Sequence, residues 1–308
     1  MSDLRRHVDD YLALRRALGF KLEHEGHVLP KLATYLGQKG SPVLTAELAV
    51  AWAQLPRHAS AITWSHRLVA ARGFATYLRA IDPRTQVPPR HVFGTGSRRP
   101  RPYLWSDAEI RALLQAARGL RPPLRAATYE AFFGLLAATG MRLGEATGLA
   151  RSDVDLTKGV ITIKEPKFGR TRLVPLHPST TAALISYSAR RDRLCPGAKR
   201  RTGTFFVSGV GTPLPASSVH WTFSTLTTSI GLRTATLRPR IHDLRHSFAV
   251  RTLVELYDLD ADVTAGLPVL SNYLGHVDPK GTYWYLSATP ELMALAAARL
   301  EANPGARP

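Results

Sequence analysis

The sequence predicts a mainly α-helical protein with two domains and a small β-sheet in the second domain. Apolar residues recur at helical spacing along most of the chain. Residues 82–102 interrupt this pattern with a high density of proline and glycine, as a linker between domains does. Two short segments, Val160–Ile163 and Arg172–Val174, have strand character and flank a turn. A length of 308 residues also favours two domains over one compact core.

Residues 1–81 are predicted to form a small all-helical domain. Their apolar residues fall on three stripes with helical spacing. These stripes are Leu29, Leu32 and Leu36; Leu44, Leu48, Trp52 and Leu55; and Trp64, Leu68, Ala71, Phe74 and Leu78. Pro30, Pro42 and Pro56 are expected to lie near the ends of the helical segments, where prolines are tolerated.

Residues 82–102 are predicted to be an extended linker, because proline and glycine at this density prevent a regular element. The segment also contains Arg84, Arg90, Arg98, Arg99 and Arg101. Two interpretations stay open. The arginines follow a phosphate backbone, or the segment is a solvated spacer.

Residues 103–308 are predicted to form a second, mainly helical domain. Ser106 and Glu109 make a capping-box pattern that begins a helix. The apolar segment Ala126–Thr139 is expected to be a core helix that ends near Gly140. The turn between the two strands is expected at residues 167–170, and further helices at 178–194, 217–230, 242–257 and from Glu291 onward.

The chain carries a large positive charge. It has 41 Lys and Arg residues against 23 Asp and Glu, which gives a formal net charge of +18 and a pI of about 10.6. A surplus of this size favours a polyanionic partner such as nucleic acid, because neutralised phosphates release condensed counterions. Membrane surfaces and acidic proteins remain alternatives on composition alone.

Composition also indicates a reducing compartment. Cys195 is the only cysteine, which excludes an intrachain disulfide and a cysteine-based zinc site. The first ten residues lack the apolar stretch of a signal peptide, and no apolar run has the length of a membrane span. We therefore expect a soluble, cytoplasmic protein with no membrane partner.

Four separated segments contain residue types that can act on a phosphate. Arg142 follows the glycine that ends the predicted core helix, and an arginine there can present a planar fork to a phosphate. His242 and Arg245, at positions i and i+3 of a helix, can point at the same atom. The other two segments are Leu274-Gly275-His276 and Thr282-Tyr283-Trp284-Tyr285. Each has an ordinary structural explanation when taken singly, such as a pairing of Arg142 with Glu145.

A metal site is disfavoured. His242 and His246 have the i, i+4 spacing of a zinc pair, but Asp243 stands where the metalloprotease pattern has glutamate. The sequence also offers no third ligand.

The order of these segments resembles the tyrosine recombinase (phage integrase) family. Arg142 comes first, then His242-x-x-Arg245, then Leu-Gly-His276, and then Tyr285 nine positions later. The hairpin Lys167-Phe168-Gly169-Arg170-Thr171-Arg172-Leu173-Val174-Pro175-Leu176 is similar to the one on which that family has its catalytic lysine. The resemblance covers the whole chain. It implies that residues 1–81 are a helical core-binding, DNA-binding domain and residues 103–308 a catalytic domain.

The resemblance implies a chemistry and a role for each residue. Tyr285 would attack a DNA phosphate, which leaves a 3′-phosphotyrosyl bond and a free 5′ hydroxyl. Arg142 and Arg245 would hold the non-bridging oxygens. Lys167 would protonate the leaving oxygen. His242 and His276 would hydrogen-bond the phosphate, with His242 the better candidate for accepting the tyrosine proton. Two fallback assignments remain open, Lys164 for the lysine and Tyr283 for the nucleophile.

The family resemblance also implies partners. The expected substrate is double-stranded DNA, recombined by a homotetramer assembled on two sites, without ATP, metal or any other cofactor. The expected context is DNA integration or transposition by a mobile element, or chromosome resolution, in the cytoplasm at the nucleoid. The apolar face of Glu291–Leu300 would dock on a neighbouring protomer or pack on its own domain. A type IB topoisomerase-like enzyme and a catalytically inactive DNA-binding protein are the alternative functions.

Overall fold

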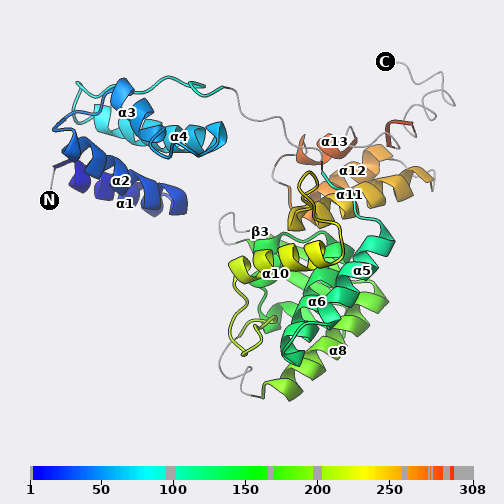
Figure 1. Ribbon diagram of the computed structural model, residues 1–308. Coiled ribbons are helices and arrows are strands. Elements are labelled where there is room, and N and C mark those ends of the chain that lie inside the picture. The colour runs from blue at the N-terminus through cyan, green and yellow to red at the C-terminus, as the bar shows by residue number, and fades with distance from the viewer. Residues whose placement is uncertain are drawn as a thin grey trace, which may run out of the picture. The chain divides into compact units, whose positions relative to one another are not determined.

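The computed structural model describes residues 3–94, 102–165, 170–196, 203–258, 263–276, 278, 280–286 and 292–294. The chain divides into two compact units, Met1–Pro100 and Arg101–Pro308. Both are built mainly of helices, and the strands form one small sheet in the second unit (Figure 1). This arrangement confirms the predicted fold class. No helix in the described ranges is both long enough and apolar enough to cross a lipid bilayer.

Four helices form the first unit: α1 (Asp3–Ala17), α2 (Glu23–Gln38), α3 (Ala46–Ala53) and α4 (Ala61–Arg79). The side-chain oxygens of Thr45 and Ser60 accept hydrogen bonds from backbone N–H groups in the first turns of α3 and α4, which fixes where these two helices begin. The apolar stripes meet in one core. Its fully buried members include Leu29, Leu32, Leu36, Trp52 and Phe74.

Two expectations for this unit are wrong. Pro30 lies inside α2 and does not mark its end. A proline there removes one hydrogen bond of the helix, but Leu29 and Leu32 on either side are fully buried, and their packing outweighs that loss. Leu55 lies beyond the end of α3 and is 54% exposed, because the helix stops at Ala53.

Part of the segment predicted as a linker packs on the first unit. The backbone N–H of Gln86 donates to the carbonyl of Leu44 at 2.9 Å, and its side-chain oxygen accepts from the N–H of Ala46. Phe93 lies against Trp64 of α4, with their ring centroids 5.7 Å apart. Residues 95–101, which contain Arg98, Arg99 and Arg101, lie outside the described residues.

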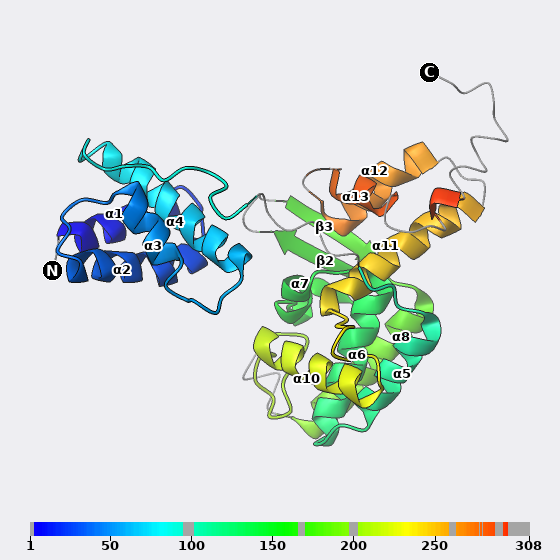
Figure 2. The same ribbon diagram turned by 45° about the horizontal axis from the view of Figure 1, so that its top comes forward.

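The long helix α6 (Pro123–Thr139) forms the centre of the second unit. It contacts α5 (Asp107–Arg118), α8 (Pro178–Leu194) and α11 (Ile241–Asp258), as Figure 2 shows. The predicted capping box at the start of α5 is present, with Ser106 and Glu109 bonded reciprocally. Phe132, Phe133, Phe206 and Phe223, the last from α10 (Ala216–Ser229), fill the core around α6 with edge-to-face contacts.

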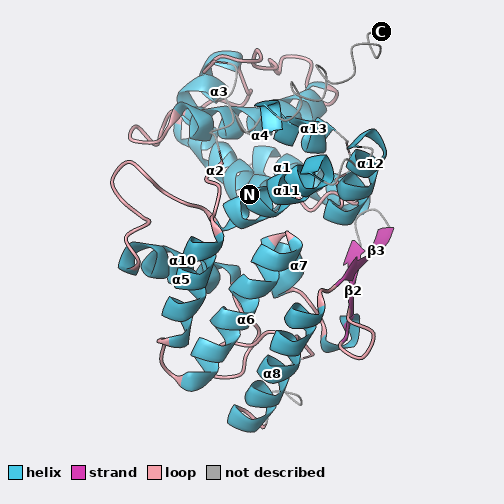
Figure 3. Ribbon diagram, turned by 90° about the vertical axis from the view of Figure 1, so that its right-hand side faces the viewer, coloured by secondary structure: helices cyan, strands magenta, loops and turns pink. Residues whose placement is uncertain are grey.

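The sheet has three antiparallel strands in the order β1 (Val154–Asp155), β2 (Val160–Glu165) and β3 (Arg170–Pro175). The two predicted strands are present and longer than expected, whereas β1 was not predicted. Ile161 pairs with Val174 and both are buried, so one face of the hairpin packs on the core. Figure 3 shows β3 beside α12 (Val263–Leu274), and contacts between the two elements agree with this view.

Helices α11, α12 and α13 (Lys280–Leu286) pack on one another and share a small core of their own. The hydroxyl of Ser247 on α11 accepts a hydrogen bond from the backbone N–H of Trp105 at 2.8 Å, which ties the start of the unit to this group. Of the predicted C-terminal helix from Glu291, the described part is helical residues 292–294, and the rest lies outside the described residues.

Gly140 ends α6 in the left-handed conformation, with φ of +60°. A Cβ at this position would lie 2.7 Å from Cδ1 of Phe248 and 3.2 Å from Cδ2 of Leu274. Both the backbone conformation and the close packing of α11 and α12 therefore require glycine.

We expect Gly140→Ala to lower the free energy of unfolding by about 2 kcal/mol, because the left-handed conformation and the steric clash both disfavour a side chain. Urea unfolding of the purified protein measures this change. Gly144→Ala in α7 (Leu143–Thr147) is the control, since a Cβ there meets no heavy atom within 4 Å in the described structure. Equal stability of the two variants would contradict the argument.

Candidate active site

Three side chains on the first turns of α11 define one face of the site. His242, Arg245 and His246 occupy positions i, i+3 and i+4, which lie on the same side of a helix. The buried carboxylate of Asp243 fixes the start of the helix, because it accepts from the backbone N–H of Arg240 at 2.7 Å and pairs with that residue's guanidinium. The direction of this helical face is therefore set by local capping.

The guanidinium of Arg245 is buried, with a residue exposure of 2%. It donates to the carbonyl oxygens of Gly140 and Leu274, each at 2.7 Å. Burial lowers the pKa of Arg245 to about 10, and the nearby Arg142 lowers it further while Tyr285 opposes the change. Arg245 is thus a fixed cation at neutral pH, and two backbone carbonyls set its direction.

Arg142 stands at the position before α7 and reaches the same region. Its guanidinium pairs with Glu145 at 2.8 Å and donates to the carbonyl oxygen of Gly275. Glu145 also accepts from the nearly buried Arg172 of β3 at 2.6 Å. Burial alone would raise the pKa of Glu145, but the hydrogen bonds from Arg172 and from the N–H of Arg142 hold it below its usual range. The expected pairing of Arg142 with Glu145 exists inside the site.

The loop after α12 contributes His276. Its Nδ1 lies 2.7 Å from the hydroxyl oxygen of the buried Thr282. Burial and the guanidinium groups of Arg245 and Arg142 lower the pKa of His276 to about 4, so the imidazole is neutral at pH 7. The preceding Gly275 has φ of +68°, and a Cβ there would lie 2.6 Å from Nη1 of Arg172. Glycine is therefore required for this close approach.

His242 is the more solvent-exposed histidine of the α11 pair. Partial burial and the charge of Arg245 still lower its pKa, so it too favours the neutral form. Its ring is nearly perpendicular to that of His246, with the centroids 4.6 Å apart. The exposed edge of His242 can meet a ligand from solution.

Tyr285 lies within this group, whereas Tyr283 does not. The ring of Tyr285 is 2% exposed, and its hydroxyl is 3.1 Å from Nδ1 of His246. It stacks on His276, with the ring centroids 6.2 Å apart and the planes at 21°. Tyr283, the fallback nucleophile of the sequence analysis, is 53% exposed. The structure thus brings together Arg142, His242, Arg245, His276 and Tyr285.

The two candidate lysines differ in what the structure describes. Lys167 falls in residues 166–169, which lie outside the described residues. Lys164 on β2 forms an ion pair with Asp153, and its side chain is 62% exposed. On β3, two residues beyond the hairpin turn, Arg172 donates to the carbonyl of Tyr273 at 2.9 Å. Strand β3 of that hairpin is therefore attached to the last turn of α12, three residues before His276.

Three members of this group, His246, Glu145 and Arg172, were not predicted as site residues from the sequence. His246 was considered as a metal ligand alone, although its i+4 spacing from His242 places the two on the same helical face. Glu145 lies three residues after Arg142, and this spacing indicates an ion pair between the two. It does not indicate that Glu145 also pairs with Arg172. No sequence signal joins Arg172 to Glu145, since the two are brought together by the docking of β3. Within the described part of the chain, no group of three or more His, Cys, Asp and Glu side chains is arranged to hold a metal ion.

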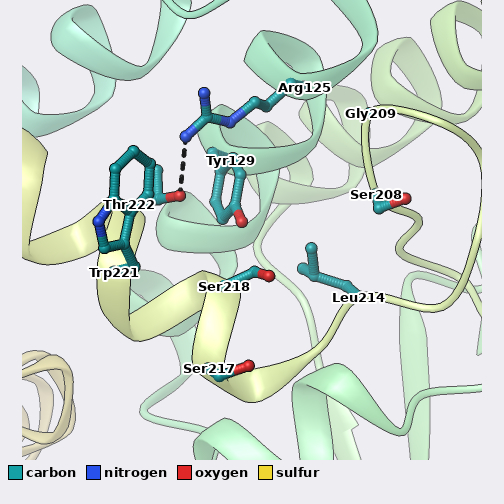
Figure 4. Close-up of a pocket in the computed structure, with 9 residues that line it drawn as sticks. All are labelled: Arg125, Tyr129, Ser208, Gly209, Leu214, Ser217, Ser218, Trp221 and Thr222. Carbon is teal, nitrogen blue, oxygen red and sulfur yellow. Dashed lines mark hydrogen bonds between the residues drawn. The ribbon is translucent and has the colours of Figure 1, made fainter.

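A separate hollow of about 450 Å³ opens between α6, α10 and the loop around Gly209 (Figure 4). Arg125 lies over the rings of Tyr129 and Trp221 and donates to the hydroxyl of Thr222 at 3.1 Å. Arg125 is at the opposite end of α6 from Gly140. The hollow contains none of the grouped residues, so its size alone does not identify the active site.

The arrangement is suited to chemistry at a phosphate. A phenol hydroxyl lies beside an imidazole, in a group that also contains guanidinium cations and neutral imidazoles, and these are the parts needed for nucleophilic attack on a phosphodiester.

Comparisons with known proteins identify the family of the chain. Residues 105–291 match the model of the phage integrase family. Over 98% of each chain, the protein is 46% identical to y4rB of Sinorhizobium fredii, which bears the name integrase/recombinase. It is 31% identical to the tyrosine recombinase XerD of Mycobacterium tuberculosis, over 80% of this chain and 73% of that one. The chain belongs to the phage integrase family, and by class it is a tyrosine-type site-specific DNA recombinase.

A solved structure shares the fold. One chain of a lambda integrase tetramer bound to a Holliday junction superposes on this protein with a TM-score of 0.62 at 17% sequence identity. The match covers 92% of this chain and 76% of that chain.

The histidine environment predicts a pH dependence of stability in the DNA-free protein. Because the pKa of His276 is about 4 in the folded state and about 6.5 in an unfolded chain, protonation favours unfolding. The stability that its neutral form contributes is full above about pH 6.5 and is lost as the pH falls toward 4. We expect the free energy of unfolding to fall more steeply over this range in wild type than in His276→Asn.

Nuclear magnetic resonance of the imidazole provides the direct measurement, with a midpoint expected near pH 4. His220→Asn, which removes an exposed histidine of α10, is the control and should leave the slope unchanged. A His276 midpoint near 6.5 would refute the prediction.

Proposed function

We propose that this protein cuts and rejoins double-stranded DNA at specific sites through a 3′-phosphotyrosyl bond to Tyr285. The observation that carries the proposal is the position of the Tyr285 hydroxyl, beside His246 and against the ring of His276, in a group that also contains Arg142 and Arg245. The net charge of +18 supports a polyanionic substrate.

In the proposed reaction, the oxygen of Tyr285 attacks phosphorus and displaces the 5′ oxygen of the next nucleotide. Arg142 and Arg245 bind the non-bridging oxygens, where negative charge develops. The exposed edge of His242 and Nε2 of His276 donate hydrogen bonds to the same phosphate. Nδ1 of His276 is engaged by Thr282, which leaves Nε2 to face the substrate. Both imidazoles serve as donors in their neutral forms.

The proposed proton donor for the leaving 5′ oxygen is Lys167. The attachment of β3 through Arg172 to Tyr273 and Glu145 supports this role, because it holds the base of the hairpin beside the site. The bond energy of the cut strand is conserved in the phosphotyrosyl link, so a 5′ hydroxyl can reverse the reaction without ATP. The guanidinium groups supply the positive charge that a metal would supply in other phosphoryl-transfer sites.

Exchange of strands between two duplexes needs more than one active site. We propose a homotetramer on two DNA sites, an arrangement supported by the fold shared with the lambda integrase tetramer. Residues 1–81 would bind DNA as a second arm joined by residues 82–102, and the basic surplus along the whole chain supports this division. The proposed context is integration, excision or transposition of a mobile element, or chromosome resolution.

A covalent complex with DNA tests the nucleophile. On a nicked substrate that traps the intermediate, wild type should form a protein–DNA adduct, and Tyr285→Phe should abolish it because the attacking oxygen is gone. Binding to the same DNA should be retained, since basic residues elsewhere supply most of the affinity. Denaturing gel electrophoresis detects the adduct, and a gel shift measures the binding.

Tyr283→Phe is the matched control, from the same helix turn but with an exposed ring. An adduct that depends on Tyr283 and not on Tyr285 would refute the assignment. DNA binding by wild type without any adduct would instead indicate an inactive binding protein. Relaxation of one supercoiled duplex, without exchange between two sites, would indicate a topoisomerase-like enzyme.

A substrate with sulfur in place of the bridging 5′ oxygen tests the proton donor. A thiolate leaves without needing a proton, so Lys167→Ala should be slow on normal DNA by about 10²-fold or more and near the wild-type rate on the sulfur substrate. Lys164→Ala is the control, because Lys164 is paired with Asp153. Rescue of Lys164→Ala alone would identify Lys164 as the acid.

The same assay in EDTA tests the independence from metal. Wild-type cleavage of normal DNA should continue at an unchanged rate, and its arrest would refute this part of the proposal.

A further inference from the structure

His246 lies beside the nucleophile but has no role in the reaction proposed for Tyr285. His246 places Nδ1 at 3.1 Å from the Tyr285 hydroxyl, which is hydrogen-bonding distance. The hydroxyl belongs to a ring that is 2% exposed, so bulk water has little access to it. When Tyr285 attacks a phosphate, its proton must go to a group already in contact with that oxygen.

The other histidines are less well placed for that proton. The ring of His276 lies nearly parallel to that of Tyr285 at 6.2 Å between centroids, and its Nδ1 already contacts Thr282. A stacked ring does not direct its nitrogen lone pair at the hydroxyl of its partner. His242 stands one helical turn before His246 on α11, with an edge open to solvent, where a phosphate can reach it.

The geometry of His246 is fixed from several sides. Its ring contacts the rings of His242, Trp284 and Tyr285 at centroid distances of 4.6, 5.3 and 5.4 Å. Trp284 and Tyr285 both belong to α13, and this helix packs directly on α11. The contact between nucleophile and imidazole is therefore part of the interface between the two helices.

We propose that His246 is a catalytic residue that accepts the proton of Tyr285 during strand cleavage and returns it during rejoining. The inference rests on the proposed function of Tyr285, and it assigns to His246 the step that the sequence analysis expected of His242. In cleavage, the O–H bond of Tyr285 breaks and its proton moves to Nδ1 of His246. The tyrosine oxygen forms the bond to phosphorus, and the P–O bond to the 5′ oxygen breaks. That oxygen takes its proton from Lys167, and every step reverses on rejoining.

The charges around His246 allow its imidazole to become protonated only while a phosphate is bound. Groups that titrate or carry charge around the pair are His242 and Arg245 on α11, Tyr285 on α13, His276 in the loop after α12, Arg142 and Glu145 at α7, and Arg172 on β3. Cations predominate among them, which opposes a further positive charge. The phosphate oxygens between Arg142 and Arg245 offset that opposition, so proton transfer to His246 is coupled to the presence of substrate.

The test isolates the proton acceptor with the sulfur substrate, on which the leaving group needs no acid. Single-turnover cleavage is measured between pH 6 and 9 for wild type, His246→Asn and His242→Asn. An asparagine oxygen can accept the hydrogen bond of the Tyr285 hydroxyl, but it cannot take the proton. We expect His246→Asn to be slower by on the order of 10²-fold at pH 7. Its rate should rise about tenfold per pH unit, because the hydroxyl must then ionise to solvent.

His242→Asn is the matched variant from the same helical face. We expect this variant to be slower than wild type, because it loses a contact with the phosphate. Its rate, like that of wild type, should become independent of pH once the imidazole that accepts the proton is neutral. His220→Asn on α10 should be unchanged in both rate and profile. If His246 has only a structural role, the rate of His246→Asn will not rise about tenfold per pH unit, and that outcome would overturn the proposal. So would a hydroxide-dependent profile in His242→Asn with a normal profile in His246→Asn.

A second measurement needs no change at position 246. A fluorinated tyrosine with a more acidic hydroxyl is incorporated at position 285 of otherwise wild-type protein. If His246 accepts the proton, the pH at which the cleavage rate becomes constant is set by the pKa of the histidine. It should then be the same as in the protein with ordinary tyrosine. A downward shift that follows the acidity of the new hydroxyl would overturn the proposal.

The same experiments distinguish failure of the proposed function from failure of the role of His246. Wild type that forms no adduct through Tyr285 on this substrate refutes the function itself. Wild type that forms the adduct, together with an unaltered His246→Asn, refutes the role of His246 alone.

Discussion

The site depends on the burial of one guanidinium group. Arg245 has two percent exposure and is held by the carbonyl oxygens of Gly140 and Leu274, which end α6 and α12 respectively. The fall of its pKa to about 10 corresponds to a cost on the order of 3 kcal/mol for keeping the charge out of water. The rest of the second unit must offset that cost, and the burial of apolar side chains around α6 contributes to it.

The same interaction explains why glycines stand where helices end. The last carbonyls of a helix have no partner within it, and Arg245 satisfies two of them from different helices. Those carbonyls can approach the guanidinium because Gly140 and Gly275 adopt left-handed conformations in which a side chain would collide with Phe248 or Arg172. Three helices that are distant in sequence are thus joined at their ends by one cation. Both Arg142 and His276 lie beside that junction, which is why disorder at either glycine would misplace the whole group.

The parts that were predictable from the sequence are those with local signals. The apolar run and glycine of α6, the capping box of α5 and the spacing of His242 and Arg245 on α11 depend on neighbouring residues only. The helices α12 and α13 were not predicted. Helix α12 contains Pro268, and α13 is seven residues long, so packing against α11 stabilises them more than propensity does. The pairing of Arg172 with Glu145 and the contact of His246 with Tyr285 join residues that are 27 and 39 positions apart, and no spacing rule covers such distances.

The balance of charge in the free site follows from these contacts. Glu145 divides its carboxylate between Arg142 and Arg172, whereas both hydrogen bonds that hold Arg245 go to neutral carbonyls. Carbonyl dipoles orient a cation without cancelling its charge, so the field of Arg245 remains directed at whatever enters the site. Burial, and after it the charge of Arg245, lowers the pKa of both His242 and His276 and favours their neutral forms. A phosphodiester would bring the missing negative charge and raise the proton affinity of every imidazole around it. Before DNA arrives, the charge of Arg245 therefore opposes transfer of the Tyr285 proton to any imidazole in the group, which ties activation of the nucleophile to occupancy of the site.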